Sequence, residues 1–579
     1  MKITIMKKAN FKSVFSMLAL SIVAGSFFVG CSNSEDLSNE LTPKEGMGIV
    51  SFSINEKDYE PSENITSTRA TVQPQPEIQD LGDGWQAEVS LVPDTTRRPE
   101  QKVATRAIYG NKHYTIRAYQ GSTLKGEIKG TFNGNNFTPD AGDPGVMQLL
   151  HGYYDFVCFN DRFTANGTTL TINRANTNDA FYTIERGVLI NQDPKQMVAF
   201  TAKHIAANVS VYLNFVNCNI EMKVASTRTE FIPGIGSQTY YKLVPKDPAN
   251  QIDWTLKTAA NDIPEKMTYD FFADTYTYPQ MGQVSSSGNT IGFEVNSASG
   301  RIFCDEQHLV SHYWLPTTDC SKLKLTFTSG ELYGRSLTGK SITVPTHKLV
   351  EANKRYNIYI RLIMENMYLF SDGTKGFLDK NLGKTPIGVF LSPTDNVAVA
   401  LKDVKVSGND AIQWSNVTSQ ESMDPVQNYE MLFYLNGYGT VTSTNTAIQA
   451  AKNSFGGRAR IPKFIDFLFM GSSLGKMANR GKGSQSSRDY SFLIPEGASS
   501  TGFIPSLSSI NFPQMDMSRF NAAFTRVGGD PMMGTYWTDT ECLDGSQYKQ
   551  VVINVGGSNY SISLAPKNST AKIRPLIWF

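Results

Sequence analysis

The cysteine at position 31 is the residue whose chemistry the flanking sequence defines most clearly. Four lysines within the first twelve residues precede an apolar run, Val14–Val29, and Gly30-Cys31 follows it directly. A basic start, an apolar run and a small residue before a cysteine are typical of a secretory signal peptide that ends in a lipobox. We therefore expect the Cys31 thiol to carry a lipid thioether, although Phe28 occupies a position where leucine is more usual. A signal peptide with a chance cysteine and a membrane helix are the alternatives, and the run is shorter than the ~18 residues of a typical span.

Five further cysteines and six histidines are the other residues that commonly bind metals or form covalent bonds. An odd number of cysteines cannot pair completely within one chain, and Cys304 and Cys320 are close enough in sequence to form a bridge outside the cytoplasm. Cys158 and Cys218 lie in apolar, strand-like runs, where buried thiols are the simpler interpretation. The fifth is Cys542. No CxxC or HExxH motif is present, so the sequence indicates neither a metal centre nor a cofactor.

Short alternating runs, rather than helical periodicity, must position these residues. Apolar and polar residues alternate within runs bounded by Gly, Asn, Asp and Pro, which is typical of antiparallel strands. In one such run Val209, Val211, Leu213 and Phe215 alternate with polar residues, so we expect one face of that strand to be buried. The expected strands are 48–54, 85–92, 112–119, 153–160, 208–215, 322–329 and 355–363. Many short strands at this density predict β-sandwiches.

Length and charge limit the architecture and the partners. A chain of 579 residues is too long for one core, and three or four domains are expected. With 54 basic and 53 acidic residues the formal net charge is +1, and no basic patch indicates a nucleic-acid partner. Helix-compatible segments appear only late, at 445–455 and 461–475, so the last region is expected to be α+β.

Changes in composition divide the chain into parts. Segment 55–82 is rich in Pro, Glu, Ser and Thr and is typical of a linker. Segment 364–377 resembles a junction between domains. The predicted fold is mainly β, with a signal peptide (1–31), a leader strand and linker (32–82), a first β-sandwich (83–215), a second β-sandwich (216–366) and an α+β C-terminal domain (378–579).

Several of these strands together resemble the fimbrillin family of bacterial pilins and their accessory subunits. The run Gly152–Asn160 resembles a late sandwich strand of that family, G-Y-x-F-V-x-Y-N, and the run 200–215 resembles its K-H-x-x-A-x-V-x-V strand. Trp314-Leu315-Pro316, followed by 349–362, resembles its closing L-P and G-x-x-Y-x-I-x-L strands, with Asn353 in place of the glycine. The resemblance spans both predicted sandwiches and implies that fold for them.

The resemblance also assigns roles to two arginine motifs and to Cys31. Ser67-Thr68-Arg69-Ala70 resembles the Arg-specific maturation site of fimbrillins, where cleavage releases the lipidated leader with its first strand; Arg106-Ala107 is the alternative site. The emptied groove would accept a strand from another pilus subunit, because unpaired edges and an apolar groove then gain a complete ladder and a filled core. If Arg69-Ala70 is cut, the lipid on Cys31, including its palmitate, holds the chain at the outer membrane only during transit to the fimbrium. If it is not cut, the anchor is permanent.

The last third resembles the C-type-lectin-like fold found at the ends of bacterial surface proteins. Arg460-Ile461-Pro462 stands for the R-L-P motif of that fold, with Asp466 at its acidic position. The runs 536–541 and 573–576 resemble its Y-W-S-S-T-E and V-R-P-V segments. The calcium-site tripeptides EPN, QPD and WND of sugar-binding animal lectins are absent, and Gly457 is followed by arginine rather than tryptophan. These departures speak against calcium-dependent glycan binding.

The motif residues of this region are expected to be structural. Pro462 fits the first turn of a helix. Arg574 is expected to pair with a carboxylate inside the domain. Trp414 and Trp537 are expected in the core, with sugar-stacking platforms as the alternative.

Three classes of function remain. The first is an adhesive pilus subunit at the tip, whose last residues, Leu576–Phe579, end inside the head and so donate no strand. Its loops 471–502 and 527–535 would contact a host or bacterial ligand, glycan or protein, with no individual ligand-binding residue assigned. The second is a non-polymerising surface lipoprotein that binds glycans for uptake. The third is an enzyme; because 378–579 contains no histidine and no convincing carboxylate pair, we expect no catalytic residue there and no enzymatic activity.

Overall fold

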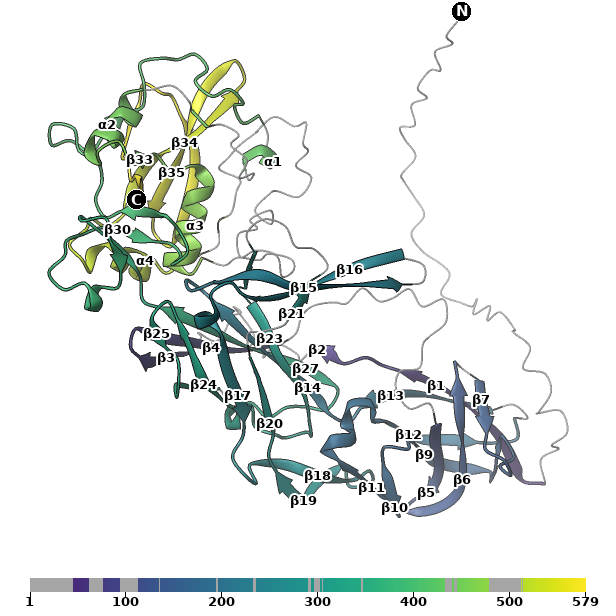
Figure 1. The fold of residues 1–579 in the computed structure, drawn as a ribbon. Helices are drawn as coiled ribbons and strands as arrows, with labels where there is room; N and C mark the ends of the chain where they lie inside the picture. The colour runs from purple at the N-terminus through teal and green to yellow at the C-terminus, as the bar shows by residue number, and fades with distance from the viewer. Residues whose placement is uncertain are drawn as a thin grey trace, which may run out of the picture.

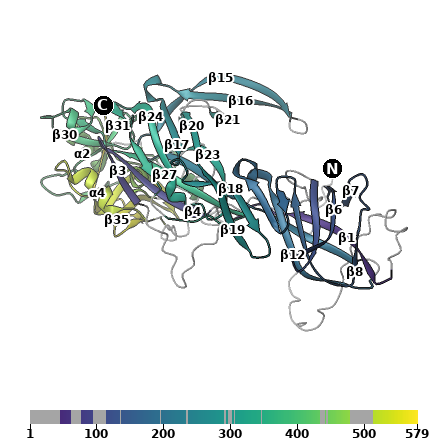
Figure 2. The ribbon, with the colours of Figure 1, turned by 90° about the horizontal axis from the view of Figure 1, so that it is seen from below.

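The computed structural model describes residues 45–61, 77–93, 113–477 and 512–579, apart from short gaps within these ranges. Cys31, Arg69-Ala70 and Arg106-Ala107 lie outside the described residues. Strands dominate the described chain, and the predicted mainly β fold is confirmed. Figures 1 and 2 show three groups of sheets that follow one another along the molecule. Within the described ranges, none of the helices is long and apolar enough to cross a membrane.

The first group, here called the first sandwich, is one eight-stranded sheet that curls around an apolar core. Strand β8 lies against β6 and β1 lies against β7, so the two ends of the sheet face each other. Phe132, Phe156 and Phe200 fill the space between them. In sheet order the strands are β7 (Asn136–Pro139), β6 (Thr123–Asn133), β5 (His113–Gln120), β9 (Gly152–Asn160), β12 (Phe181–Ile190), β13 (Gln196–His204), β1 (Met47–Glu56) and β8 (Met147–Leu150).

A small sheet joins the first group of strands to the second. Its order is β10 (Thr164–Asn166), β11 (Thr169–Asn173), β18 (Ile263–Asp270) and β19 (Thr275–Gly282), and η1 (Arg174–Asp179) follows β11. Phe159 of the first group packs in one cluster with Leu170, Met267 and Tyr269 of this small sheet and with Leu315 of the second group. The two groups therefore share a core, and all of its residues follow the Arg69-Ala70 and Arg106-Ala107 motifs.

The second group, here called the second sandwich, packs sheets around Trp85, Trp254 and Trp314. One sheet contains β23 (Glu306–Trp314), β14 (Ala207–Phe215), β27 (Lys354–Met364), β4 (Trp85–Pro93) and β3 (Glu77–Gly82), with β2 (Glu60–Pro61) added to β27. The facing sheet contains β20 (Ser285–Asn289), β17 (Ile252–Lys257), β24 (Lys324–Leu332), β25 (Arg335–Ser336) and β26 (Ser341–Thr343); η2 (Pro248–Asn250) and η3 (Cys320–Lys322) lie in the connections.

A long hairpin belongs to this second group and projects from it in both views (Figures 1 and 2). It consists of β15 (Ile220–Ile232) and β16 (Gly236–Pro245), flanked at its base by β22 (Ile302–Cys304) and β21 (Phe293–Val295). Much of β15 is exposed beyond Met222, so the hairpin adds little to the core.

The sheets do not follow the boundaries expected from the sequence. Strands β4 and β14 fall in the predicted range 83–215, yet both pair with β27 in the second sandwich. Strand β1, which lies in the predicted leader range 32–82, pairs with β13 and β8 of the first sheet, as a leader strand that fills a groove requires. The sequence ranges assume that neighbours in sequence share a sheet, whereas β14 pairs in parallel with a strand about 150 residues away. All seven expected strands do form strands.

Within the described residues, the C-terminal group combines three sheets with four α-helices and one 3-10 helix. Its strands are β28 (Tyr368–Phe370), β29 (Lys375–Gly376), β30 (Pro386–Phe390), β31 (Val397–Ala400), β32 (Ile412–Gln413), β33 (Ala459–Arg460), β34 (Gly534–Asp544), β35 (Gln547–Gly556), β36 (Asn559–Ala565), β37 (Thr570–Ala571) and β38 (Leu576–Trp578). The helices are η4 (Leu378–Lys380), a 3-10 turn, and α1 (Tyr429–Leu432), α2 (Thr446–Ser454), α3 (Phe464–Gly475) and α4 (Met517–Thr525). The group already includes β28, so it begins before the predicted residue 378.

The two late helices expected from the sequence are present. Helix α2 begins after Asn445, whose side chain accepts a hydrogen bond of 2.9 Å from the Ile448 amide. Helix α3 begins at Phe464, and the carboxylate of Asp466 accepts a bond of 2.8 Å from the Lys463 amide. Pro462 therefore precedes the helix cap rather than occupying the first turn, which corrects its expected place. Its carbonyl accepts a bond from the Asp539 amide instead.

Candidate functional site

Strand β1 and the short segment after it, together residues 45–61, form the leader segment, which is the candidate functional site. The backbone of β1 pairs in parallel with β13 from Val50 to Glu56, and antiparallel with β8 from Met47 to Val50. Among the described strands, only β13 pairs with the second half of β1. That half is therefore held by one ladder and by its side chains.

The side chains of β1 on its inner face belong to the core of the first sandwich. Val50, Phe52 and Ile54 are all buried. The Phe52 ring stacks on Phe200 and meets Phe156 edge to face, with centroids 5.9 Å apart in both pairs. Each buried apolar side chain of this size stabilises the fold by about 1.5–3 kcal/mol. Removing β1 would leave an apolar groove between β13 and β8.

Two further contacts fix β1 in this place. The carboxylate of Glu56 is buried and accepts a hydrogen bond from the hydroxyl of Tyr114, and its charge together with burial raises the pKa of Tyr114. At the other end a side chain at Gly48 would come within 2.6 Å of Ile190. Only glycine allows that approach of β1 to β12, so the register of the strand is defined at both ends.

Beyond β1 the leader segment crosses to the second sandwich. The Lys57 amide donates to the Ala202 carbonyl at 2.9 Å, and the Glu60 amide donates to the Asn353 carbonyl at 2.8 Å. Strand β2 then pairs in parallel with the start of β27, Glu60 opposite Lys354. One continuous segment thus completes the sheet of one sandwich and extends the sheet of the next.

The C-terminal strand β38 is held in a different way. It pairs on one side with β31 and on the other with β33. Just before it, the buried Arg574 donates to Asp403 at 2.7 Å and to the Leu401 carbonyl at 2.7 Å. The expected pairing of Arg574 with a carboxylate is confirmed.

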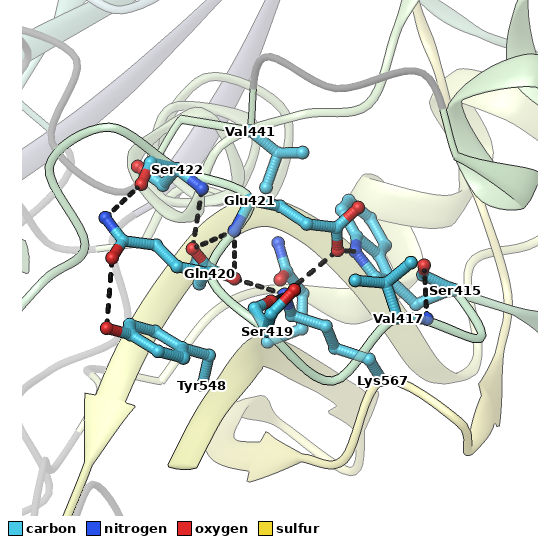
Figure 3. A network of polar contacts seen from close by, with 12 residues as sticks. Ser415, Val417, Ser419, Gln420, Glu421, Ser422, Val441, Tyr548 and Lys567 are labelled. Atoms are coloured by element: carbon cyan, nitrogen blue, oxygen red, sulfur yellow. Dashed lines mark hydrogen bonds and ion pairs between the residues drawn. The ribbon is translucent and has the colours of Figure 1, made fainter. Parts of the chain in front are cut away.

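A second buried ion cluster lies under the loop 415–422 (Figure 3). Lys567 is fully buried and pairs with both Glu541 and Glu421, the latter at 2.9 Å. It also donates to the Ser419 carbonyl at 2.7 Å. Glu541 accepts the backbone amides of Glu421 and Ser422. Because its charged groups are enclosed and bonded to one another, the cluster attaches the loop to β34 and to the connection between β36 and β37.

Among the residues that the structure describes, none with a positive charge forms a hydrogen bond with one buried carboxyl near this cluster. Asp539 is buried and accepts a bond of 3.0 Å from the Val441 amide. Burial raises the pKa of Asp539 to about 7, so its charge changes near neutral pH. It makes the C-terminal group sensitive to pH.

The other side chains considered at the sequence level occupy structural positions. Trp414 and Trp537 are fully buried in one cluster, as expected for core residues. Cys158 and Cys218 are buried thiols, as expected; Cys304 and Cys320 are buried thiols as well. Burial raises the pKa of the Cys218 and Cys320 thiols to about 12, which makes them poor nucleophiles.

Several predictions lie wholly or partly outside the described residues. The loop 471–502 is described only to Met477, whereas 527–535 connects α4 to β34. Among the described residues, no three His, Cys, Asp or Glu side chains form a group that could hold a metal ion.

No protein-family model matches the sequence, and no curated protein matches it. Solved structures match the chain with low TM-scores and low sequence identity. A fimbrial protein from Bacteroides vulgatus is 14% identical, covers 43% of this chain and 89% of its own, and has a TM-score of 0.26. A fimbrial protein from Bacteroides ovatus is 10% identical, covers 92% of this chain and 99% of its own, and has a TM-score of 0.20.

The sequence reasoning missed two groups of residues. The first is the set of contacts that the leader segment makes with the second sandwich. The sequence feature that could have indicated these contacts is the run Asp58-Tyr59-Glu60, shortly after the expected strand 48–54. No neighbouring residue in the sequence identifies the partners of this run. The second is the cluster of Glu421, Glu541 and Lys567, whose members are far apart in sequence and follow no motif.

Proposed function

We propose that this chain is a structural and adhesive subunit of a bacterial surface fimbrium, assembled by β-strand exchange. The observation that carries the proposal is the position of β1. The strand fills a slot in the core of the first sandwich, and the chain that follows it leads to the Arg69-Ala70 motif. A single cut there would separate β1 from the rest of the first sandwich.

The physical gain from exchange follows from what β1 leaves behind. Its removal exposes the β13 edge and apolar side chains such as Phe156 and Phe200. A strand from another subunit with apolar residues at alternate positions would restore the ladder and refill the core. The gain is large because exposed apolar area and unpaired backbone groups are both unfavourable in water.

The lipid on Cys31 belongs to the same scheme. Cys31 lies on the leader side of Arg69, so cleavage would release the subunit from its anchor together with β1. The lipid would hold the precursor at the outer membrane, and the mature subunit would reside in the fimbrium.

The C-terminal group serves, in this proposal, as a lectin-like head that binds a glycan or protein at the tip of the fimbrium. The engagement of β38 on both sides supports the tip position, since this strand is not placed to be given to a neighbour. The buried tryptophans are not available for sugar stacking, so ligand contact would come from the loops. We propose a binding rather than an enzymatic role for this head.

The mature N-terminus tests the proposal. Filaments sheared from the surface of bacteria that express the chain should begin at Ala70, and Arg69→Gln should abolish both this cleavage and assembly. Arg106→Gln is the matched control and should leave both unchanged. If the protein recovered from intact cells begins only at lipid-modified Cys31, whether or not filaments are present, strand exchange is contradicted. That result would favour a permanently anchored glycan-binding lipoprotein.

The adhesive role needs a separate measurement. Intact filaments should bind defined glycans or extracellular-matrix proteins on an array. Replacement of the loop residues 527–533, which precede β34, should remove that binding while filament length and number stay the same. Equal binding by filaments that lack this subunit would contradict the assignment of the head as the adhesin.

A further inference from the structure

The end of the leader segment carries charge that is matched by the second sandwich. Glu60 pairs with Lys354 at 3.1 Å, and Asp58 pairs with Arg355 at 3.2 Å. With the leader segment in place, the two cationic side chains are only 16% and 13% exposed. The core of the first sandwich is apolar, so this end of the segment is chemically different from β1.

An aromatic contact lies between the two ion pairs in sequence. The Tyr59 ring stacks on the buried imidazole of His204, with centroids 3.8 Å apart and planes 10° apart. His204 also packs against Phe181, with ring centroids 4.2 Å apart and planes tilted by 41°. His204 is the last residue of β13, so the stack continues the slot of β1 directly. The guanidinium of Arg355 lies 5.9 Å from the Tyr59 ring and covers it further.

Loss of the leader segment would uncover all of these groups at once. Lys354 and Arg355 would lose the carboxylates of Glu60 and Asp58, and one face of the His204 ring would be exposed. The three residues form a charged and aromatic surface at the end of the apolar groove, here called the junction clamp. The shared core around Met267 stays in place, so the sandwiches remain joined and the clamp keeps its position beside the groove.

We infer that the site that accepts a neighbouring subunit's strand has two parts, the apolar groove of the first sandwich and the junction clamp, which Lys354 and Arg355 of the second sandwich form with His204 of the first. The occupant is a β-strand of a neighbouring fimbrial subunit that carries alternating apolar side chains, followed at the clamp end by acidic and aromatic side chains. This inference rests on the proposed strand exchange and specifies the partner strand.

The junction clamp would define the register of the accepted strand, which the apolar groove alone does not. An alternating strand can slip by two residues and still present apolar side chains to the groove. The acidic residues of the leader follow Ile54 by four and six positions, or about 13–20 Å of extended chain. A slipped strand would carry its carboxylates out of reach of Lys354 and Arg355. The clamp therefore selects partner and register together.

Release of a labelled strand from the cut chain tests this inference. Residues 32–579, with a specific protease site in the linker 62–76, are cut and loaded with a fluorescent peptide of residues 45–61 in place of the leader. Dissociation is then followed after addition of excess unlabelled peptide. We expect Lys354→Ala with Arg355→Ala to release the peptide about tenfold faster, equivalent to about 1.4 kcal/mol. Lys324→Ala, which alters an exposed lysine of β24, is the matched control and should not change the rate.

A double-mutant cycle shows whether the pairs themselves are responsible. The peptide with Asp58→Asn and Glu60→Gln should dissociate from the unaltered protein about tenfold faster than the unaltered peptide does. From the clamp variant, the two peptides should dissociate at the same rate. Added salt should speed release from the unaltered protein and not from the clamp variant. Additive effects, or equal rates for all proteins, would overturn the two-part site.

The two proposals fail in different ways. If the cut protein binds no peptide even with the clamp intact, strand exchange itself is contradicted. If it binds the peptide in the groove and the clamp variants change nothing, strand exchange stands and the two-part site is wrong. Circular dichroism and hydrogen exchange of β27 amides check that the clamp variants are folded.

Discussion

The strands β1 and β38 lie at opposite ends of the described chain and are held by different physical means. Both fit between two neighbours in a sheet. Strand β1 is held by a backbone ladder and by apolar side chains, with its polar contacts concentrated near its end. Strand β38 follows an arginine that is buried among its own domain's oxygen atoms.

The way each strand is held determines whether it can be exchanged. Backbone ladders and apolar contacts are generic, so another alternating strand can reproduce them. A buried ion pair requires one charge at one place, and a foreign strand would leave the partner charge unpaired at a cost of several kcal/mol. We therefore expect the first sandwich to release and accept strands, and the C-terminal group to remain closed. Five predictions test this contrast.

The largest effect is expected in the closed C-terminal group. Lys567→Met leaves Glu421 and Glu541 buried without their shared cation and should destabilise this group by about 3–5 kcal/mol. Urea unfolding followed by tryptophan fluorescence measures the loss. Lys402→Met, at an exposed position, should change stability by less than about 0.5 kcal/mol. A small effect of Lys567→Met would mean that buried charge does not close this group.

The apolar attachment of β1 predicts a comparable but conditional effect. Phe52→Ala removes a ring that touches Phe156 and Phe200 and should cost about 3–4 kcal/mol in the uncut chain. Hydrogen exchange of β13 amides reports the opening of the slot, and Ser53→Ala is the control on the same strand. Once a different strand fills the groove, the substitution should have no effect, because the altered residue has left. An effect that persists after exchange would contradict a replaceable β1.

Acidification should weaken the leader end. Burial lowers the pKa of His204 from 6.5 to about 4, and Asp58, Asp179, Arg355 and Tyr59 surround it. Below pH 6.5 the unfolded chain binds a proton that the folded chain excludes, so stability falls as the pH decreases towards 4. From pH 7 to pH 5 we expect a loss of about 2 kcal/mol. His204→Phe retains the stack and should remove this part of the pH dependence in urea titrations; an unchanged slope would contradict it.

The C-terminal group should respond to acid with the opposite sign. The Asp539 carboxyl, with its pKa raised from 3.8 to about 7, takes up a proton in the folded state before the unfolded chain does. Its contribution to stability therefore rises by about 2 kcal/mol as the pH falls from 7 to 5. Asp539→Asn should abolish that rise while the response of His204 persists. A rise that survives the substitution would have to come from another group.

The smallest effect is expected from the ion pairs at the junction. Asp58→Asn with Glu60→Gln in the uncut chain should reduce stability by only about 1.4 kcal/mol for the two pairs together, because both carboxylates are partly exposed. The loss should vanish at high salt, unlike that of Phe52→Ala. A larger, salt-independent loss would show that these side chains act through packing rather than charge.

The sequence alone determined the local elements of this protein. Alternation of apolar residues predicted strands such as β9, β14 and β27, and Asn445 marked the start of α2. It also placed Trp414, Trp537 and the Cys158 thiol inside. These predictions hold because side-chain periodicity records which face of an element must leave water.

Only the tertiary structure decided which elements meet. The parallel pairing of β1 with β13 joins residues about 146 positions apart, and it moves an expected leader strand into a core. The contacts of Asp58 with Arg355 and of Lys567 with Glu541 arise in the same way. Alternation predicts that a segment pairs with the edge of another strand, but it does not identify that strand, because many edges would fit. The ion pairs form only after the whole fold has determined which strands are neighbours. For this reason the sequence could suggest a removable strand, whereas the junction clamp became visible only in the folded chain.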